Sequence, residues 1–182
     1  MNESEEIISV RSNEVLLNEL IDQYGDELKR VAFLYVNDVN QCEDIIQEVF
    51  ISCYNNLNHF KNKSSYKTWL YRITINKCKD YLRRWSFRNI VYSPVMQVIS
   101  RDSVESPQKI YEKSFESNEI INSLSSLSAK YKEVLILFYY QEMTLKEISE
   151  ITHTKVNTVK SRLNRGRKLL KEELERRNDE NE

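Results

Sequence analysis

Glycine and proline are both scarce in this chain of 182 residues. It contains two glycines, Gly25 and Gly166, and two prolines, Pro94 and Pro107, whereas average usage would give about 13 and about 9. Sheets need tight turns, and tight turns draw on these two residue types. The scarcity therefore argues against sheet-rich folds and predicts an all-α protein. It also excludes a glycine-rich phosphate-binding loop.

Long apolar segments are missing as well. The longest uninterrupted apolar run is the seven residues 134–140, far short of the ~20 that cross a bilayer. The N-terminal sequence MNESEEII is acidic and lacks the basic and apolar parts of a secretory signal. We therefore expect a cytoplasmic protein with no direct membrane insertion.

Cysteine is too rare and too irregularly placed to stabilise the fold through disulfides or a metal site. Cys42, Cys53 and Cys78 are odd in number, and their spacing fits neither a disulfide framework nor a zinc site. We predict reduced, buried thiols. A metal or redox-switch role stays open as the alternative.

The charges are segregated along the chain, although the formal net charge is only −1. Residues 61–88 carry nine lysines and arginines against a single acid, Asp80. Residues 155–171 carry seven bases and no acid. Two separated basic blocks in a nearly neutral chain indicate two contacts with a polyanion.

Hydrophobic periodicity predicts helices in two groups. The first group covers 12–36, a segment around 43–57 with apolar residues at three- and four-residue spacing, and 66–85. Residues 86–117 hold both prolines and seven serines and predict a linker. The second group begins near Glu119 and ends with a short helix over 144–151 and a basic helix over 156–176. We therefore predict two small helical domains, 1–87 and 119–176, with a flexible linker at 88–118 and a disordered tail at 177–182.

Residues 144–165 have the pattern of a helix-turn-helix. Leu145, Ile148 and Ile151 face inward on the first helix, and the second helix begins after four intervening residues. The second helix exposes side chains that reach phosphates and base edges in a major groove. These are Asn157, Thr158, Lys160, Ser161, Arg162 and Arg165. The alternative is a helical hairpin whose basic face is merely solvated.

Aromatic residues are interleaved with the first basic block, among them Phe60, Tyr66 and Trp69. Aromatic rings stack on unpaired bases while lysine and arginine hold the backbone, which is the chemistry of single-strand binding. Core packing is the competing interpretation for Tyr66 and Trp69, which lie on the apolar stripe. No catalytic pattern accompanies the block, because His59 and His153 lie in predicted turns without partners at metal or triad spacing.

Two stretches resemble a known family. Residues 43–83 contain DIIQEVF and YKTWLYRI and resemble region 2 of extracytoplasmic-function (ECF) sigma factors, small bacterial transcription initiation subunits of the sigma-70 family. Residues 127–174 contain the helix-turn-helix and resemble region 4 of the same proteins. The resemblance implies a DNA-binding protein, with no enzyme activity, metal or cofactor, that binds core RNA polymerase, directs it to promoters and helps open the minus-ten element.

The resemblance also implies three sets of contact residues. The surface for the clamp helices of the largest polymerase subunit would comprise Asp44, Ile45, Gln47, Glu48 and Ile51. The minus-ten reader would comprise Phe60, Lys63, Ser64, Ser65, Tyr66, Lys67, Trp69, Arg72, Asn76, Lys79 and Arg83. The minus-thirty-five reader would add Lys155 and Lys168 to the six exposed residues of the second helix.

The implied partners are core RNA polymerase, including its flap, and promoter DNA as duplex and as melted single strand. An anti-sigma factor, often membrane-bound in this family, would hold the protein inactive until a stress signal. The protein would then be nucleoid-associated when bound to polymerase. Two other classes compete: a stand-alone helix-turn-helix transcriptional regulator, and a helical adapter without a nucleic-acid role. The regulator leaves the first basic block without a purpose, and both basic blocks argue against the adapter.

Overall fold

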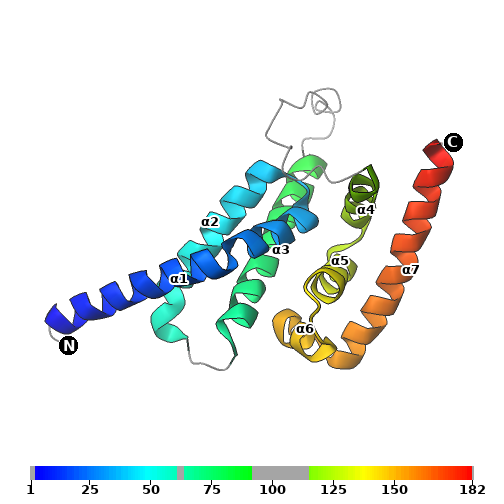
Figure 1. Ribbon diagram of the computed structural model, residues 1–182. Helices are drawn as coiled ribbons and strands as arrows, with labels where there is room; N and C mark the ends of the chain where they lie inside the picture. The colour runs from blue at the N-terminus through cyan, green and yellow to red at the C-terminus, as the bar shows by residue number, and fades with distance from the viewer. Residues whose placement is uncertain (1–2, 61–63, 92–114, 182) are drawn as a thin grey trace.

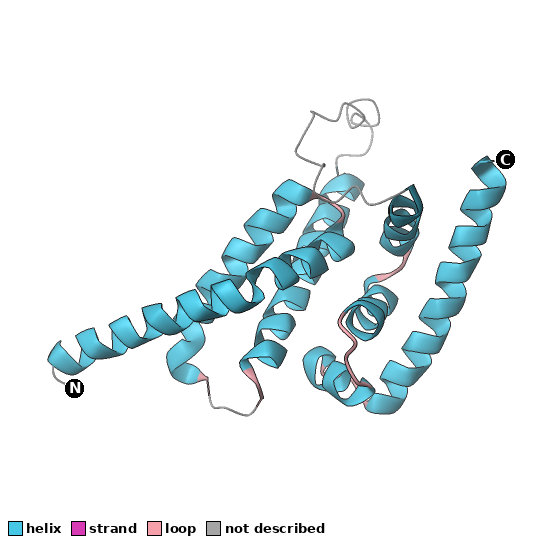
Figure 2. Cartoon of the chain, viewed as in Figure 1, coloured by secondary structure: helices cyan, strands magenta, loops and turns pink. Residues whose placement is uncertain are grey.

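A computed structural model describes residues 3–60, 64–91 and 115–181 of the chain. Within these ranges every regular element is helical and no strand is present (Figure 2). The helices form two groups that lie side by side, with α1, α2 and α3 in one and α4 to α7 in the other (Figure 1). The predictions of an all-α fold and of two helical domains are confirmed.

The N-terminal group contains α1 (Glu3–Val36), α2 (Val39–Asn56), the short 3-10 helix η1 (Leu57–His59) and α3 (Tyr66–Val91). The predicted break after the first helix is real and narrow. Asn37 takes a left-handed conformation with φ of 54°, and the Asp38 side chain then accepts a hydrogen bond from the Gln41 amide at 3.0 Å. This cap satisfies one of the free N–H groups that begin α2.

The core of this domain contains the stripe that the periodicity of α2 predicted. Val49 and Cys53 are fully buried, and Phe50 and Leu57 are nearly so. They face Leu28, Val31 and Ala32 of α1 and Leu70 of α3 within one apolar cluster. Burial of each large aliphatic side chain contributes about 1.5 to 3 kcal/mol, so this interface sets how α2 and α3 present their outer faces.

All three cysteines are free and buried, as predicted. Burial raises the pKa of Cys42 to about 12 and that of Cys53 to about 11, and it also raises the pKa of Cys78. The reactive thiolate is therefore almost absent near neutral pH.

We expect the folded chain to resist alkylation. Iodoacetamide at pH 8 should leave Cys42, Cys53 and Cys78 unmodified over a time in which a free cysteine reacts completely, because the thiols are both buried and protonated. In denaturant all three should react, as counted by intact mass. Stoichiometric labelling of the folded chain would contradict this and reopen the redox-switch alternative.

The C-terminal group contains α4 (Phe115–Ser126), α5 (Ala129–Leu135), the π-helix η3 (Ile136–Tyr140), α6 (Leu145–Thr152) and α7 (Val156–Asn181). Thr144 and Glu147 form a reciprocal capping box at the start of α6. His153 ends α6 in the left-handed conformation, with φ of 50°. These two features set the bend between α6 and α7, and they confirm the predicted helix-turn-helix.

Helix α7 runs along α4, α5 and α6 on the outer side of this group (Figure 1). Gly166 permits the close approach of α7 to α5, because a β-carbon there would lie 3.2 Å from Leu135 Cδ1. The helix continues to Asn181 and so includes most of the segment predicted as a tail. Helices also take both ends of the predicted linker, as far as Val91 and from Phe115; its middle part, 92–114, lies outside the described residues. No helix in the described part of the chain is long and apolar enough to span a membrane.

The two groups of helices pack directly against each other. Helix α1 contacts α4 and α5, and α3 contacts α6. The Tyr35 hydroxyl donates to the Ala129 carbonyl at 3.2 Å, and the Tyr71 hydroxyl donates to Gln141 Oε1 at 2.5 Å. Both tyrosines are fully buried, so the described chain has a compact arrangement in which the apolar cores are continuous.

Candidate polymerase and nucleic-acid interfaces

The first candidate surface is the polar face of α2. Asp44, Gln47 and Glu48 are exposed and form what we call the polar row of α2. Ile51 on the same helix is 61% exposed. Ile45, which was also predicted for this surface, is buried in the apolar core. Glu48 accepts from Lys77 Nζ of α3 at 3.0 Å, which ties the row to the neighbouring helix.

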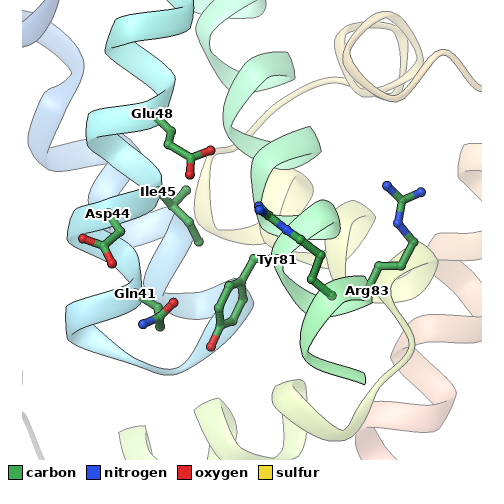
Figure 3. Close-up of a pocket in the computed structure, with 7 residues that line it drawn as sticks. Gln41, Asp44, Ile45, Glu48, Tyr81 and Arg83 are labelled. Atoms are coloured by element: carbon green, nitrogen blue, oxygen red, sulfur yellow. The ribbon is translucent and has the colours of Figure 1, made fainter. Parts of the chain in front are cut away.

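An open groove lies between this row and α3 (Figure 3). It has a volume of about 570 Å³ and is bounded by Asp44, Ile45 and Glu48 on α2 and by Tyr81 on α3. In the close-up, Tyr81 reaches from α3 toward the part of α2 that carries Gln41 and Ile45. Arg83 and Arg84 complete the lining. The groove has acidic residues on one wall and basic residues on the other, a pattern that suits a polar protein partner.

The second candidate surface surrounds the start of α3. Phe60 stacks on Tyr66 with ring centroids 4.5 Å apart, and Trp69 lies 4.8 Å from Phe60. All three rings are half-buried. The three rings therefore pack against one another and still keep exposed surface that a ligand could contact.

A pocket of about 300 Å³ opens beside these rings. Phe60, Ser64, Trp69 and Arg72 were predicted for this reader and do line it. The other lining residues, Ser52, Asn56, His59 and Ile73, were not. The sequence analysis placed His59 in a turn without partners at metal or triad spacing. Its position directly before Phe60 was the sequence feature that could have indicated its place in this pocket.

The remaining residues predicted for the minus-ten reader have different environments. Ser65 caps α3, since its Oγ accepts from the Thr68 amide at 3.1 Å. Lys67 lies over the Tyr71 ring at 5.8 Å. Asn76 and Arg83 are exposed. Lys63 lies outside the described residues.

The third candidate surface is the outer face of α7. Six of the eight predicted residues are exposed on or directly before it: Lys155, Asn157, Lys160, Ser161, Arg165 and Lys168. Thr158 is half-buried. Arg162 differs from the rest, because its Nη1 donates to Glu133 Oε1 at 3.1 Å and lies 3.4 Å from Thr154 Oγ1. Its side chain is 28% exposed.

Two charged residues of α5 are buried where the two domains meet. Glu133 pairs with Arg162 of α7 and with Lys79 of α3. Lys132 Nζ donates to the carbonyls of Tyr35 and Ser125, each at 3.0 Å, and burial lowers its pKa to about 8. Sequence reasoning missed both residues, because their partners in the other domain, Tyr35 and Lys79, are far from them along the chain.

Comparisons with known proteins agree with this arrangement. Residues 20–87 match the family model for Sigma-70 region 2, and residues 117–170 match the model for Sigma-70, region 4. The ECF RNA polymerase sigma factor SigW of Bacillus subtilis (strain 168) is 32% identical over 170 residues, which cover 86% of this chain and 87% of SigW. The chain belongs to the ECF sigma factors. RNA polymerase sigma factor SigV of the same strain is 28% identical over 164 residues, covering 90% of this chain and 94% of SigV.

Solved structures with the same fold include sigma factors. The sigma factor RpoE of Bartonella quintana, solved with the anti-sigma factor NepR, superposes with a TM-score of 0.70 at 22% identity, covering 87% of this chain and 96% of RpoE. CnrH, solved with the cytosolic domain of CnrY, gives a TM-score of 0.68 at 20% identity, covering 93% and 94%. In this ECF sigma factor, α1 to α3 therefore carry region 2, and α4 to α7 carry region 4. Sigma factors are transcription initiation factors that bind core RNA polymerase and promoter DNA.

Proposed function

We propose that this ECF sigma factor uses the polar row of α2 to bind the clamp helices of the largest polymerase subunit. Support comes from the exposure of Asp44, Gln47 and Glu48 along one face and from the groove beside them. Ile51 supplies an apolar contact at the end of the row. A polar row with an apolar anchor is a typical composition for a specific interface.

The pocket beside Phe60 is the proposed binding site for a base flipped out of the minus-ten element. Phe60 and Trp69 offer aromatic surface for stacking, and Ser52, Asn56 and His59 bring polar groups for the base edge. Arg72 Nε is buried and has no hydrogen-bond partner among the described residues, so an incoming nucleotide would satisfy it. Asn76, Lys79 and Arg83 along α3 would hold the strand, the last two through phosphates.

The exposed face of α7 is the proposed reader of the minus-thirty-five duplex. Asn157, Lys160, Ser161 and Arg165 project from the second helix of the helix-turn-helix, the element that enters the major groove in this motif. Arg162 takes part by positioning α7 rather than by reading bases, since Glu133 and Thr154 hold its guanidinium.

We further propose regulation by an anti-sigma factor during a stress response, because the structural relatives RpoE and CnrH were solved with NepR and with CnrY. The factor would work in the cytoplasm, where it meets RNA polymerase. The observation that carries the whole proposal is the occurrence of both sigma regions in one chain, in order, with an exposed polar row on the first and an exposed basic helix on the second.

Run-off transcription with purified core polymerase on a promoter library tests this function. We expect initiation only when the chain is added. Asp44→Ala should weaken core binding about tenfold, as loss of a central interface contact does. The matched control is Glu43→Ala, which removes an exposed acid from the same helix, where it pairs with Lys29 inside region 2, and should change core binding less than about twofold. Absence of both initiation and core binding, with duplex binding retained, would favour the stand-alone regulator instead.

A further inference from the structure

Val156 interrupts the polar character of the outer face of α7. It is the first residue of this helix, and it is 42% exposed. Its exposed neighbours Lys155, Asn157, Lys160 and Ser161 all carry polar or charged side chains, as do the exposed residues that follow up to position 168. An apolar side chain left in solvent loses the stabilisation that burial would give it. Its place among nucleic-acid contacts therefore needs a physical reason.

The apolar stripe of α7 does not supply that reason. Val156, Val159 and Leu163 follow one another at three- and four-residue spacing, which predicts a single inward stripe. Val159 is fully buried and Leu163 is 6% exposed, whereas the stripe leaves the core at its first residue. Val156 therefore lies at the border between the inner and the outer face of the helix, one turn before Lys160.

The start of α7 is held in a fixed position. Lys155 immediately precedes the helix, and its carbonyl accepts from the Val159 amide at 3.0 Å. Ser149 Oγ of α6 donates to the Thr154 carbonyl at 2.6 Å. These bonds tie the turn before Val156 to both helices, so the valine loses little conformational entropy when it makes a contact.

The position of Val156 favours a base edge as its contact. In helix-turn-helix proteins the N-terminal residues of the second helix contact base edges in the major groove. All four bases present hydrogen-bonding groups there, and thymine alone adds a methyl group. A valine side chain neither donates nor accepts a hydrogen bond, so the thymine methyl is the group against which it packs favourably. The adjacent Asn157 has the amide that pairs with an adenine edge, so the two residues together suit A·T pairs.

We propose that Val156 is a specificity-determining residue of the minus-thirty-five reader, and that its side chain packs against the 5-methyl group of a thymine in the major groove. This inference rests on the proposed function of α7. The contact favours thymine over cytosine, because the cytosine amino group would face an apolar side chain without a hydrogen-bond partner. Burial of the methyl group contributes about fourfold to the affinity.

Replacement of thymine by deoxyuridine tests this contact, because the two bases differ only in the methyl group. The probe is a fluorescein-labelled promoter duplex obtained from the run-off library, in which each thymine of the minus-thirty-five element is replaced in turn on both strands. Holoenzyme assembled from core polymerase and the full wild-type chain should bind one of the deoxyuridine duplexes about fourfold more weakly. With Val156→Ala, the thymine duplex itself should bind about fourfold more weakly, and deoxyuridine should cause no further loss.

Two variants serve as controls. Val15→Ala removes an exposed valine from α1 of region 2. It should leave the affinity within about twofold of wild type and keep the fourfold loss with deoxyuridine. Asn157→Ala should weaken binding and also keep that loss, because the valine is still present. Comparison of the deoxyuridine response between wild type and Val156→Ala is a double-mutant cycle, which separates the contact from a general effect on α7.

Three outcomes would overturn the contact: selected promoters with no thymine on either strand of the element, equal wild-type affinity for all the duplexes, or a Val156→Ala chain that keeps the loss with deoxyuridine. Arg165→Ala distinguishes such a failure from failure of the proposed function. If Arg165→Ala weakens promoter binding while no methyl effect is seen, α7 remains the reader and Val156 is not part of it. If neither Arg165→Ala nor Asn157→Ala affects promoter binding, the proposed reader fails as well.

Discussion

Replacing Arg162 by alanine is expected to lower the free energy of unfolding by about 3 kcal/mol. The change removes the region 4 partner of a carboxylate that is almost fully buried, and a buried charge left without its partner is among the costlier single defects. Lys79 remains on the other oxygen of Glu133, which keeps the loss at the lower end of the usual range. For a chain of this length the midpoint of thermal unfolding should fall by roughly 6 to 12 °C.

The matched control is Arg165→Ala. Arg165 lies three residues farther along α7 and is exposed, so its loss should change the free energy of unfolding by less than about 0.5 kcal/mol. The two variants should differ in which property they change. Arg165→Ala should lower the affinity for duplex DNA and reduce its salt dependence by about one counterion, with unchanged stability. Arg162→Ala should mainly lower stability. Chemical denaturation and binding at several salt concentrations separate the two roles. An Arg162→Ala chain of wild-type stability that loses duplex affinity would show that Arg162 is a reader after all.

The different environments of these two arginines on one helix show what can and what cannot be predicted from the sequence. Periodicity predicted α7 and its inward residues Val159 and Leu163, which are buried as expected. Arg162 lies next to these inward residues, at a position where the spacing of apolar residues does not decide between the inner and the outer face of the helix. Its partner Glu133 is 29 residues away, and no local pattern predicts a pairing over that distance.

The packing of region 4 on region 2 could not be predicted from the sequence either. Local periodicity ranks Lys132 and Glu133 as surface residues, because they lie on the polar side of α5, yet both are buried. Each of them also has a partner in the other domain, Tyr35 for Lys132 and Lys79 for Glu133, and residues 92–114 separate the two domains along the chain. In the pocket beside Phe60, Asn56 and His59 were missed for a related reason, since the short helix η1 places them beside Trp69 and Arg72 of α3 in one pocket lining.

Lys132 should make its contribution to the free energy of unfolding rise with pH in the alkaline range. Burial lowers its pKa from 10.5 to about 8. Between these two values the unfolded chain holds a proton that the folded chain has lost, so the contribution of this lysine to stability rises with pH. Below pH 8 the folded state bears the full cost of a buried ammonium, and above pH 10.5 that cost is gone.

Comparison of the wild-type chain with Lys132→Met isolates this contribution. The difference in free energy of unfolding, wild type minus variant, should shift in favour of the wild type by roughly 2 kcal/mol between pH 7 and pH 9.5. Tyr71, whose pKa burial raises, titrates in both chains and cancels in the difference.

Lys130→Met provides the control for this measurement, since it removes an exposed lysine from the same helix and should give the same difference from wild type at both pH values. Urea denaturation at the two pH values, followed by circular dichroism, measures each term. A Lys132→Met difference that stays constant with pH would mean that the ammonium keeps its proton in the folded chain. The bonds from Lys132 Nζ to the carbonyls of Tyr35 and Ser125 would then outweigh its desolvation, and the junction between the two domains would hold a permanent positive charge.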